Sequence, residues 1–497
     1  MAVMAAIDLG AQSGRVALGE FDGERLALSE VHRFANVPVQ VRGTLYWDVL
    51  RLYQDALDGL RAAARQARID SVAVDSWAVD FGLLDRSRRL LRNPVHYRDA
   101  RRGAAVPGVF SRVPARELYE RTGIQLLPIN TVFELAAMVD ERDPALKAAE
   151  TLLLIPDLLH YWLCGSRTTE FTNATTTQCF DPHAGRWATD LLDRLEVPSR
   201  LLPEIVQPGT PLDEVAAEVR EATGLGAAAT IAVATHDTGS AVAAVPFSTT
   251  SSAFLSVGTW SLVGVEVAEP LIDGETFAEN LTNEGGVAGT FRLLRNVTGL
   301  WLLRECRRSW ALEGHEHSFE ELNALAESAP ALRSFVDPDD RAFAPPGDMA
   351  ARVVEFCART GQPEPADTGA IVRCILESLA LKHAQVVGVL GRVTGRAPRE
   401  LHLVGGGARN ELLCRWTAEA AALPVLAGPE EATLVGNFLV QAMALGQISS
   451  LAEAREIVRA SFPLRTYEPA GSADWLDARE RFARLTQAQS LLEASAR

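Results

Sequence analysis

The sequence is poor in cysteine and lacks the short motifs of several large protein classes. It has six cysteines in 497 residues, and none of them forms the C-x-x-C pair of zinc sites and thioredoxin-like sites. This sparse use argues against a disulfide-stapled secreted domain and suits a reducing compartment. The Walker A pattern and the G-x-G-x-x-G fingerprint are also missing, so neither a P-loop nor a dinucleotide-binding fold is indicated.

Positive charge is in deficit as well. The chain has 48 Lys and Arg residues against 64 Asp and Glu residues, which gives a formal net charge of -16. An excess of negative charge disfavours nucleic acid or an anionic membrane as the main partner. It does not exclude ATP, because backbone N–H groups and a metal ion can hold phosphates.

Long apolar runs and a basic leader are not found. No stretch approaches the roughly 18 apolar residues of a membrane span. The opening residues, MAVMAAIDLG, lack the basic and long apolar regions of a signal peptide. We therefore expect a cytoplasmic protein that does not bind membranes. The sequence does not distinguish a monomer from a dimer.

Strand and helix patterns alternate along the chain, which predicts an α/β architecture. Residues 3–8 are expected to form a buried strand, followed by a glycine turn and a second strand. A helix is expected over 47–68 and a buried strand over 69–75. Residues 252–267 repeat the order of strand, glycine turn and strand, which fits an internal duplication and an unrelated hairpin equally well.

The length predicts more than one domain. A small polar stretch at 244–251 separates two apolar segments and predicts a boundary there. We expect an N-terminal domain over 1–247 and a C-terminal domain over 248–497. The loop-rich stretch 335–349 is interpreted as a surface excursion of the second domain, and a terminal amphipathic helix is expected from 474.

Asp8 ends the first expected strand, immediately before a turn of small residues from Gly10 to Gly14. A carboxylate at this place can position Mg²⁺ through water. The small residues let phosphate oxygens approach backbone N–H groups closely. An ordinary hairpin turn explains the same pattern equally well.

Two further segments suit a nucleotide. Thr259 follows a glycine in the second strand–turn–strand pattern, where its hydroxyl can donate to a phosphate. The strand at 401–404 runs into three glycines, and Asn410 then caps a helix that begins at Glu411. This order of strand, glycines and helix suits the close approach of a base and ribose.

Asp237 follows an apolar strand at 230–234 and stands at the start of a helix. A kinase that phosphorylates a hydroxyl needs a carboxylate to accept the hydroxyl proton. The commoner role of an Asp at this place is only to cap the helix. The triplet Asp80-Phe81-Gly82 resembles the protein-kinase metal motif, but the accompanying catalytic loop is missing, so we treat it as chance.

Taken together, these segments resemble the FGGY carbohydrate kinases over nearly the whole chain. Of the matching segments, TNATTTQ and the pair HDT and GTWSL are the most specific. The segments that carry the resemblance, in chain order, are AIDLGAQSGRV, DSWAVDFGLLD, YERTGIQLLPINT, EFTNATTTQ, HDTGSA, GTWSL, NLTNEGG, RNVTGLWLL and LVGGGARNELL.

The resemblance implies two actin-like (ribonuclease H-like) ATPase domains with an interdomain cleft, and it implies ATP and Mg²⁺ as cofactors. It implies Asp237 as general base and Asp8 as the carboxylate on the metal side. The implied nucleotide contacts are Ala11, Gln12, Ser13, Gly14, Arg15, Thr259, Arg304 and Gly406. The implied sugar contacts are Ala78, His236, Asp237, Thr238 and Asn296.

The reaction implied is ATP-dependent phosphorylation of L-rhamnulose to L-rhamnulose 1-phosphate, a step of L-rhamnose catabolism. Three positions depart from the family pattern: Ala78 and Arg304 stand where glycine and an amide residue are usual, and Gly239 replaces an alanine. Ala78 keeps open a kinase for another ketose, such as L-fuculose or L-xylulose. A rival from another class is an actin-like ATP-binding protein that phosphorylates nothing.

Overall fold

The structure, a computed structural model, describes residues 2–495. Its internal contacts divide the chain into two compact units, each built from three separate segments. Unit 1 consists of Met1–Pro246, Glu266–Leu293 and Ala432–Phe462, and unit 2 consists of Phe247–Val265, Leu294–Glu431 and Pro463–Arg497. The expected division into 1–247 and 248–497, and the expected cleft, stay predictions.

The sheet of unit 1 has six strands in the order β13-β14-β6-β1-β2-β3. The first three strands along the chain form an antiparallel meander, with β1 (Ala2–Leu9) antiparallel to β2 (Ser13–Phe21), as expected, and β2 antiparallel to β3 (Leu26–Ala35). β6 (Ser71–Ser76) is parallel to β1, and β14 (Ala229–Ala232) is parallel to β6. Every residue of β1 is buried, which explains its nearly continuous apolar sequence. The two edge strands are β13 (Thr210–Glu214) and β3.

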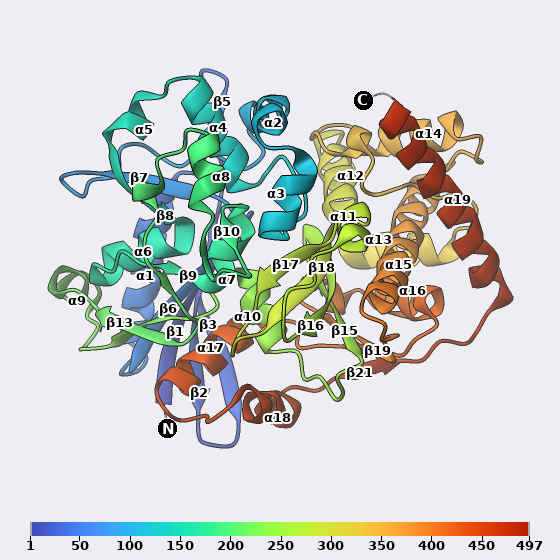
Figure 1. Ribbon diagram of the computed structural model, residues 1–497. Helices are drawn as coiled ribbons and strands as arrows, with labels where there is room; N and C mark the ends of the chain where they lie inside the picture. Colours follow the sequence, from blue (N-terminus) through green and yellow to red (C-terminus); the bar gives the residue numbers. More distant parts are fainter. Residues whose placement is uncertain (1, 496–497) are drawn as a thin grey trace. The chain divides into compact units, whose positions relative to one another are not determined.

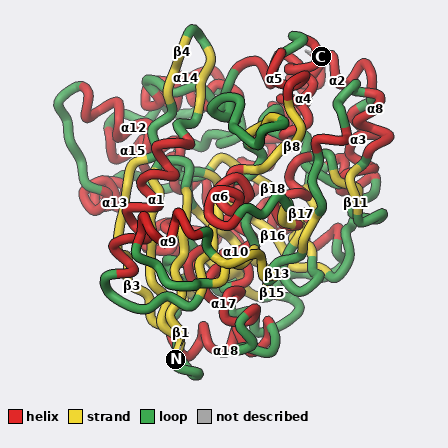
Figure 2. The backbone as a smooth tube through the Cα atoms, turned by 90° about the vertical axis from the view of Figure 1, so that its left-hand side faces the viewer, coloured by secondary structure: helices red, strands yellow, loops and turns green. Residues whose placement is uncertain are grey.

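Helices cover both faces of this sheet. A Cβ on Gly59 of α1 (Val49–Ala64) would meet Val16, and a Cβ on Gly19 would meet Phe438 of α17 (Ala432–Ala444). Residues 16 and 19 point to opposite faces of a strand, so the two helices lie on opposite sides. In Figure 2 the α1 side faces the viewer, with α6 (Ile155–Cys164) and α9 (Ala217–Thr223) on the same side.

A late segment of the chain therefore completes unit 1. α17 and α18 (Leu451–Ser461) lie beside β1, β2 and β3. The side chain of Gln441 on α17 donates to the carbonyl oxygen of Ala5 on β1 at 3.1 Å, although more than 400 residues separate the two in sequence. Figure 1 shows these helices in orange and red beside the blue strands. Further elements of unit 1 are β4 Val39–Val41, β5 Thr44–Tyr46, β7 Phe81–Asp85, α2 Ala100–Arg112, α3 Ala115–Thr122, α4 Thr131–Asp140, α5 Pro144–Ala148, β8 Ala149–Leu154, β9 Thr169–Glu170, α7 Phe171–Ala174, β10 Phe180–Asp181, β11 Arg186–Trp187, α8 Thr189–Arg194, β12 Ile205–Val206, α10 Asp237–Ala243, α11 Gly274–Ala278 and β17 Thr282–Gly285.

The second sheet has the order β17-β18-β16-β15-β19-β20-β21. β15 (Ser252–Val257) is antiparallel to β16 (Trp260–Val267) and parallel to β19 (Glu400–Val404). This is the pairing that β1 makes with β2 and β6, so the strand–turn–strand pattern seen twice in the sequence has the same pairing in both sheets. The other elements are β18 Phe291–Thr298, α12 Trp301–Leu312, α13 Phe319–Ser328, α14 Met349–Arg359, α15 Thr368–Val393, α16 Glu411–Ala421, β20 Val425–Ala427, β21 Arg465–Tyr467 and α19 Ala473–Ser495.

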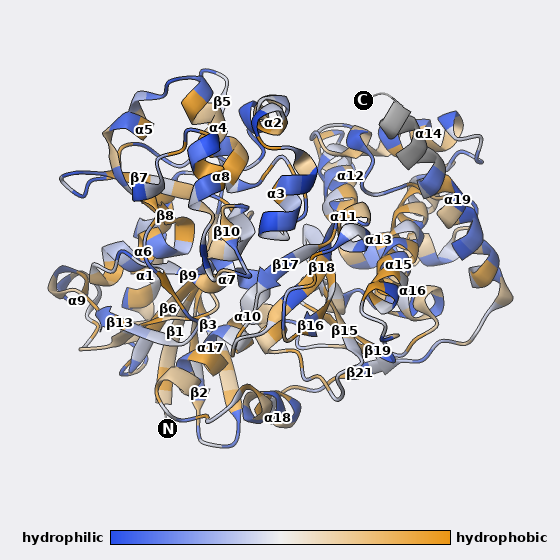
Figure 3. Cartoon of the chain, viewed as in Figure 1, coloured by the Kyte–Doolittle hydropathy of each residue, from blue (hydrophilic) through white to orange (hydrophobic). Residues whose placement is uncertain are grey.

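Apolar residues are concentrated in the strands and in the core helix α15. Figure 3 shows the strands β1 and β6 mainly orange, while α19 carries blue patches. Among the described residues, α15 alone has the length and hydropathy of a membrane span, but 83% of its most apolar window is buried in the protein. The interpretation of 335–349 as a surface excursion is wrong in part, because Phe335, Val336 and Phe343 are at most 1% exposed and anchor the segment.

Candidate active site

The Asp237 corner lies where the chain leaves β14 and enters α10. His236 occupies the N-cap position without a side-chain hydrogen bond to the helix, and Asp237 is the first helical residue, so Asp237 is not the N-cap that the alternative requires. Its Oδ1 accepts hydrogen bonds from the backbone N–H of Thr238 at 2.5 Å and from the Thr238 hydroxyl at 3.2 Å. His236 Nε2 lies 3.4 Å from the same oxygen.

This arrangement makes the two oxygens of the Asp237 carboxylate different. Oδ1 is occupied by the contacts with Thr238 and His236, whereas no described residue donates to Oδ2. The side chain keeps 31% exposure. Burial raises the pKa of Asp237 above its ordinary value, the charge of Asp8 adds to this, and His236 and the Thr238 donors oppose it. Asp237 can therefore accept a proton at Oδ2 from a group that reaches the corner.

A second carboxylate, Glu170, holds the backbone of this corner. Its Oε2 accepts from the N–H and the hydroxyl of Thr235, both at 2.9 Å, and from the Thr172 hydroxyl at 2.5 Å. The Thr172 hydroxyl in turn accepts from the backbone N–H of His236 at 3.2 Å. Glu170 is fully buried, and burial raises its pKa against the effect of these donors. Glu170 lies in the segment EFTNATTTQ, which resembles the family, but no local pattern in that segment distinguishes Glu170 from its neighbours.

Asp8 and Asp75 stand side by side because they are register partners in the parallel pair of β1 and β6. Asp8 Oδ2 accepts from Arg15 Nε at 2.8 Å and makes an ion pair with Arg15 Nη2 at 2.7 Å. Asp75 Oδ2 accepts from Asn437 Nδ2 at 2.5 Å. Burial and the neighbouring Asp8 charge raise the pKa of Asp75 well above its ordinary value. Within residues 2–495 no group of three or more His, Cys, Asp and Glu side chains is placed to hold a metal.

The glycine turn after β1 is held by Asn36, a residue that no local sequence pattern distinguishes. Its backbone N–H donates to the Gln12 carbonyl at 3.0 Å and its side chain donates to the Gly10 carbonyl at 2.9 Å. Gly14 has no room for a side chain, since a Cβ there would lie 2.2 Å from the Phe34 ring. The segment Ala11–Arg15, whose last three residues begin β2, is thus held in shape by residues on β3 and directly after it.

Ala78 begins a tight turn. Asp80 N–H donates to the Ala78 carbonyl at 3.0 Å, and Val79 between them has a φ of 69°, which a β-branched residue rarely adopts. The Thr131 hydroxyl donates to the Val79 carbonyl at 2.7 Å. Backbone strain of this kind persists only where the surroundings hold it.

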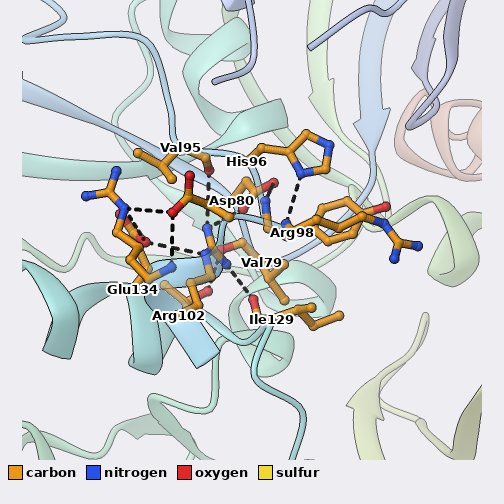
Figure 4. A network of polar contacts seen from close by, with 12 residues as sticks. Val79, Asp80, Val95, His96, Arg98, Arg102, Ile129 and Glu134 are labelled. Atoms are coloured by element: carbon orange, nitrogen blue, oxygen red, sulfur yellow. Dashed lines mark hydrogen bonds and ion pairs between the residues drawn. The ribbon is translucent and has the colours of Figure 1, made fainter. Parts of the chain in front are cut away.

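The surroundings of this turn are a buried polar network (Figure 4). Figure 4 shows Arg102 between Asp80 and Glu134, with Arg102 Nη2 2.5 Å from Asp80 Oδ1 and Arg102 Nε 3.4 Å from Glu134 Oε2. The indole N–H groups of Trp47 and Trp77 donate to Asp80 Oδ2 at 2.5 and 3.0 Å. Burial raises the pKa of Asp80, and Arg102 and the two indoles oppose that shift. Asp80 is therefore a structural anchor of the turn, in agreement with treating its protein-kinase-like triplet as chance.

In unit 2, Arg304 Nη1 donates to the Thr259 hydroxyl at 2.9 Å. Because a guanidinium has no acceptor, the Thr259 oxygen accepts this bond and keeps its own proton for another acceptor. Burial lowers the pKa of Arg304. A Cβ atom added to Gly407 would lie 2.4 Å from Val257. A Cβ atom added to Gly406 would have no atom within 4 Å. Open space therefore faces the middle glycine.

The structure places the predicted residues in two groups. Unit 1 holds Asp8, Ala11, Gln12, Ser13, Gly14, Arg15, Ala78, His236, Asp237 and Thr238, and unit 2 holds Thr259, Asn296, Arg304 and Gly406. Asn296 lies half-buried on β18. The predicted base and most predicted sugar contacts therefore share unit 1, while the predicted adenosine motif belongs to unit 2.

Comparison with known proteins bears on both units. The model of the N-terminal domain of the FGGY family of carbohydrate kinases matches residues 3–244, and that of the C-terminal domain matches residues 253–445. The chain is 45% identical over 471 residues to a rhamnulokinase of Bacteroides thetaiotaomicron, which covers 95% of this chain and 96% of that protein. It is 41% identical over 492 residues to a rhamnulokinase of Pectobacterium carotovorum subsp. carotovorum, covering 98% and 97%.

A solved structure agrees in fold. The ligand-bound xylulose kinase of Lactobacillus acidophilus matches with a TM-score of 0.82 over 100% of this chain and 99% of that one, at 17% identity. Likeness at this identity concerns the fold, which is the two-domain mixed α/β fold of these kinases. With both domain models matched and near relatives spanning almost its full length, the chain belongs to the FGGY family of carbohydrate kinases.

Proposed function

We propose that the protein transfers the γ-phosphoryl group of ATP to the primary hydroxyl of L-rhamnulose, giving L-rhamnulose 1-phosphate and ADP. The observation that carries the proposal is the Asp237 carboxylate, whose Oδ1 is occupied and whose Oδ2 is open at the start of a helix. The curated relatives described above, which are named rhamnulokinase, support the choice of sugar.

In the proposed reaction, the O1 hydroxyl of the ketose gives its proton to Asp237 Oδ2 as its oxygen forms the bond to the γ-phosphorus. The bond from that phosphorus to the bridging oxygen of ADP breaks, and ADP leaves with those electrons. The raised pKa of Asp237 makes the carboxylate a stronger base than an exposed aspartate. His236, Thr238, Ala78 and Asn296 are the proposed contacts that hold the sugar for this transfer.

ATP enters as its Mg²⁺ complex, so the metal is part of the substrate. The described residues offer no cluster that would hold Mg²⁺ alone, and Asp8 already pairs with Arg15. Asp8 is the single carboxylate proposed to reach the ion, and contact through water fits the preference of Mg²⁺ for keeping its waters. Mg²⁺ neutralises charge that develops on the β- and γ-phosphates.

The phosphates and adenosine have their own proposed contacts. The proposed donors to phosphate oxygens are the backbone of Ala11–Arg15 in unit 1 and the Thr259 hydroxyl in unit 2, which Arg304 orients. The open space at Gly406 suits the flat adenosine. A catabolic kinase that consumes ATP is proposed to work in the cytoplasm.

The experiment is a coupled assay of ADP release with Mg-ATP and a panel of L-rhamnulose, L-fuculose, L-xylulose, D-xylulose and glycerol. We expect a kcat/KM for L-rhamnulose about a hundredfold above the others, the scale on which pocket contacts discriminate. Preference for another ketose would refute the sugar but keep the reaction. No sugar-dependent ADP release, together with ATP-dependent filaments in negative-stain microscopy, would favour the actin-like binding protein.

A further inference from the structure

A buried ion pair lies directly behind His236 in unit 1. Arg292 on β18 is 0% exposed and Glu284 on β17 is 4% exposed. Arg292 Nη1 lies 3.2 Å from Glu284 Oε2, and Arg292 Nε donates to the Gly285 carbonyl at 2.8 Å. The other terminal nitrogen, Nη2, lies 3.1 Å from His236 Nδ1. The guanidinium is thus held on two sides, with its third nitrogen directed at the histidine ring.

We infer that Arg292 and Glu284 are positioning residues that keep the ring proton of His236 on Nε2 and off Nδ1, so that this N–H is directed at Asp237. The inference rests on the proposed function for its catalytic consequence, but the tautomer itself follows from the chain's own contacts.

The chemistry of the two side chains decides the tautomer. A guanidinium has five N–H donors and no acceptor, and it stays protonated in proteins. Nδ1 of His236, 3.1 Å from Arg292 Nη2, must therefore accept and carry no proton. A neutral imidazole then has its single proton on Nε2, which is 3.4 Å from Asp237 Oδ1.

Glu284 presents the competing arrangement. Its Oε2 is 3.4 Å from His236 Nδ1, a geometry that would favour a proton on Nδ1. That proton would lie against the nearer guanidinium, and the same Glu284 oxygen lies closer to Arg292 Nη1, at 3.2 Å in an ion pair, than to the histidine nitrogen. Glu284 therefore orients Arg292, and Arg292 sets the histidine.

The consequence for the reaction lies in the orientation of the Asp237 carboxylate. With Nε2–H in place, Oδ1 receives donors from both Thr238 and His236, and Oδ2 is left toward the acceptor hydroxyl. With the other tautomer, a lone pair on Nε2 would face Oδ1 and repel it. Because misplacement of a reacting group by about 1 Å can cost about 100-fold in rate, we expect loss of the tautomer to lower kcat by about that factor.

The test combines spectroscopy and kinetics. The full-length protein is labelled with ¹⁵N-histidine, and the His236 signals are assigned from their loss in His236→Gln. We expect the wild type to show an unprotonated Nδ1 and a protonated Nε2. A protonated Nδ1 would overturn the inference, and this measurement needs neither a sugar nor a variant of the ion pair.

The double variant Arg292→Met/Glu284→Gln removes both charges together, so that no buried charge is left unpaired. We expect mixed tautomers and a kcat about 100-fold lower per folded molecule, with the KM for ATP within twofold of wild type. Arg292→Lys keeps a donor opposite Nδ1 and is expected to keep the Nε2–H tautomer and most of kcat. A double variant with the wild-type tautomer and kcat would overturn the inference.

These outcomes separate the inference from the proposed function. If Asp237→Asn retained full turnover, the base role of Asp237 would fail while the tautomer result stood. If Asp237→Asn were inactive and the wild-type Nδ1 were protonated, the positioning role would fail while the base role stood.

Discussion

Gly436 of α17 is predicted to be the least replaceable glycine of unit 1, since it touches the backbone of the helix that begins at Asp237. A Cβ on Gly436 would lie 1.8 Å from the carbonyl oxygen of Ser240 on α10. Restoring even a 3.0 Å approach needs a displacement of about 1.2 Å. α17 packs against β1 and β6 on one side and against α10 on another, so the displacement must carry α10 with it.

The expected effect of Gly436→Ala has two parts. Forced overpacking of this kind costs on the order of 1–3 kcal/mol, which would lower the urea midpoint of unfolding. Because Ser240 is only three residues after Asp237, a shift of about 1 Å at the base is expected to lower kcat by about 100-fold. Urea denaturation followed by fluorescence, and the coupled ADP assay at saturating substrates, measure the two effects.

A matched control is available in Gly388 of α15, another helical glycine. No atom lies within 4 Å of a Cβ placed there, so Gly388→Ala is expected to stabilise the protein by about 0.5–1 kcal/mol through helix propensity alone. Gly388→Ala should keep wild-type kcat. If Gly436→Ala behaved like Gly388→Ala in both measurements, the close packing of α17 on α10 would be refuted.

Three further predictions concern the site itself. Asp237→Asn should lower kcat by at least about 100-fold, while calorimetry should still detect binding of sugar and ATP. Because the pKa of Asp237 is raised from 3.8, wild-type activity should fall with decreasing pH through a value above 3.8. Asp8→Asn removes a charge that raises this pKa, so it should move the fall in activity to lower pH. Thr131→Val removes the donor to the strained turn at Ala78 and should raise the KM for the sugar about fivefold, on the scale of about 1 kcal/mol for one hydrogen bond, with the KM for ATP unchanged. Arg304→Met should raise the KM for ATP, and adding Thr259→Val should raise it little more, because both changes remove the same oriented hydroxyl; additive effects would show that Arg304 acts on ATP separately.

Local patterns in the sequence were sufficient for the elements that carry the predicted phosphate and adenosine contacts. The strand that carries Asp8 near its end, the hairpin around Thr259 and the helix capped by Asn410 all form where they were expected. These features depend on apolar periodicity, glycine and capping side chains within a few residues of one another. The α/β fold and the kinase family were predicted for the same reason, since the motifs are short and keep their order.

The supporting groups around those motifs could not be chosen from the sequence. Glu170 contacts Thr235 from 65 residues away, and Arg292 contacts His236 from 56 residues away. A buried carboxylate or guanidinium has no local signal, because its role depends on partners that only the folded chain brings within hydrogen-bonding distance. The sequence placed Asp237 at a helix start but could not show which of its oxygens is occupied.

The chain by itself therefore determined its strands, its glycine turns and the acidic residue at the start of α10, because each is specified by neighbours in sequence. Only the tertiary structure decided that α17 belongs to unit 1, where Asn437 reaches Asp75 across 362 residues and Gly436 packs on Ser240. Such contacts follow from shape and burial over the whole unit, and a local pattern has no access to them.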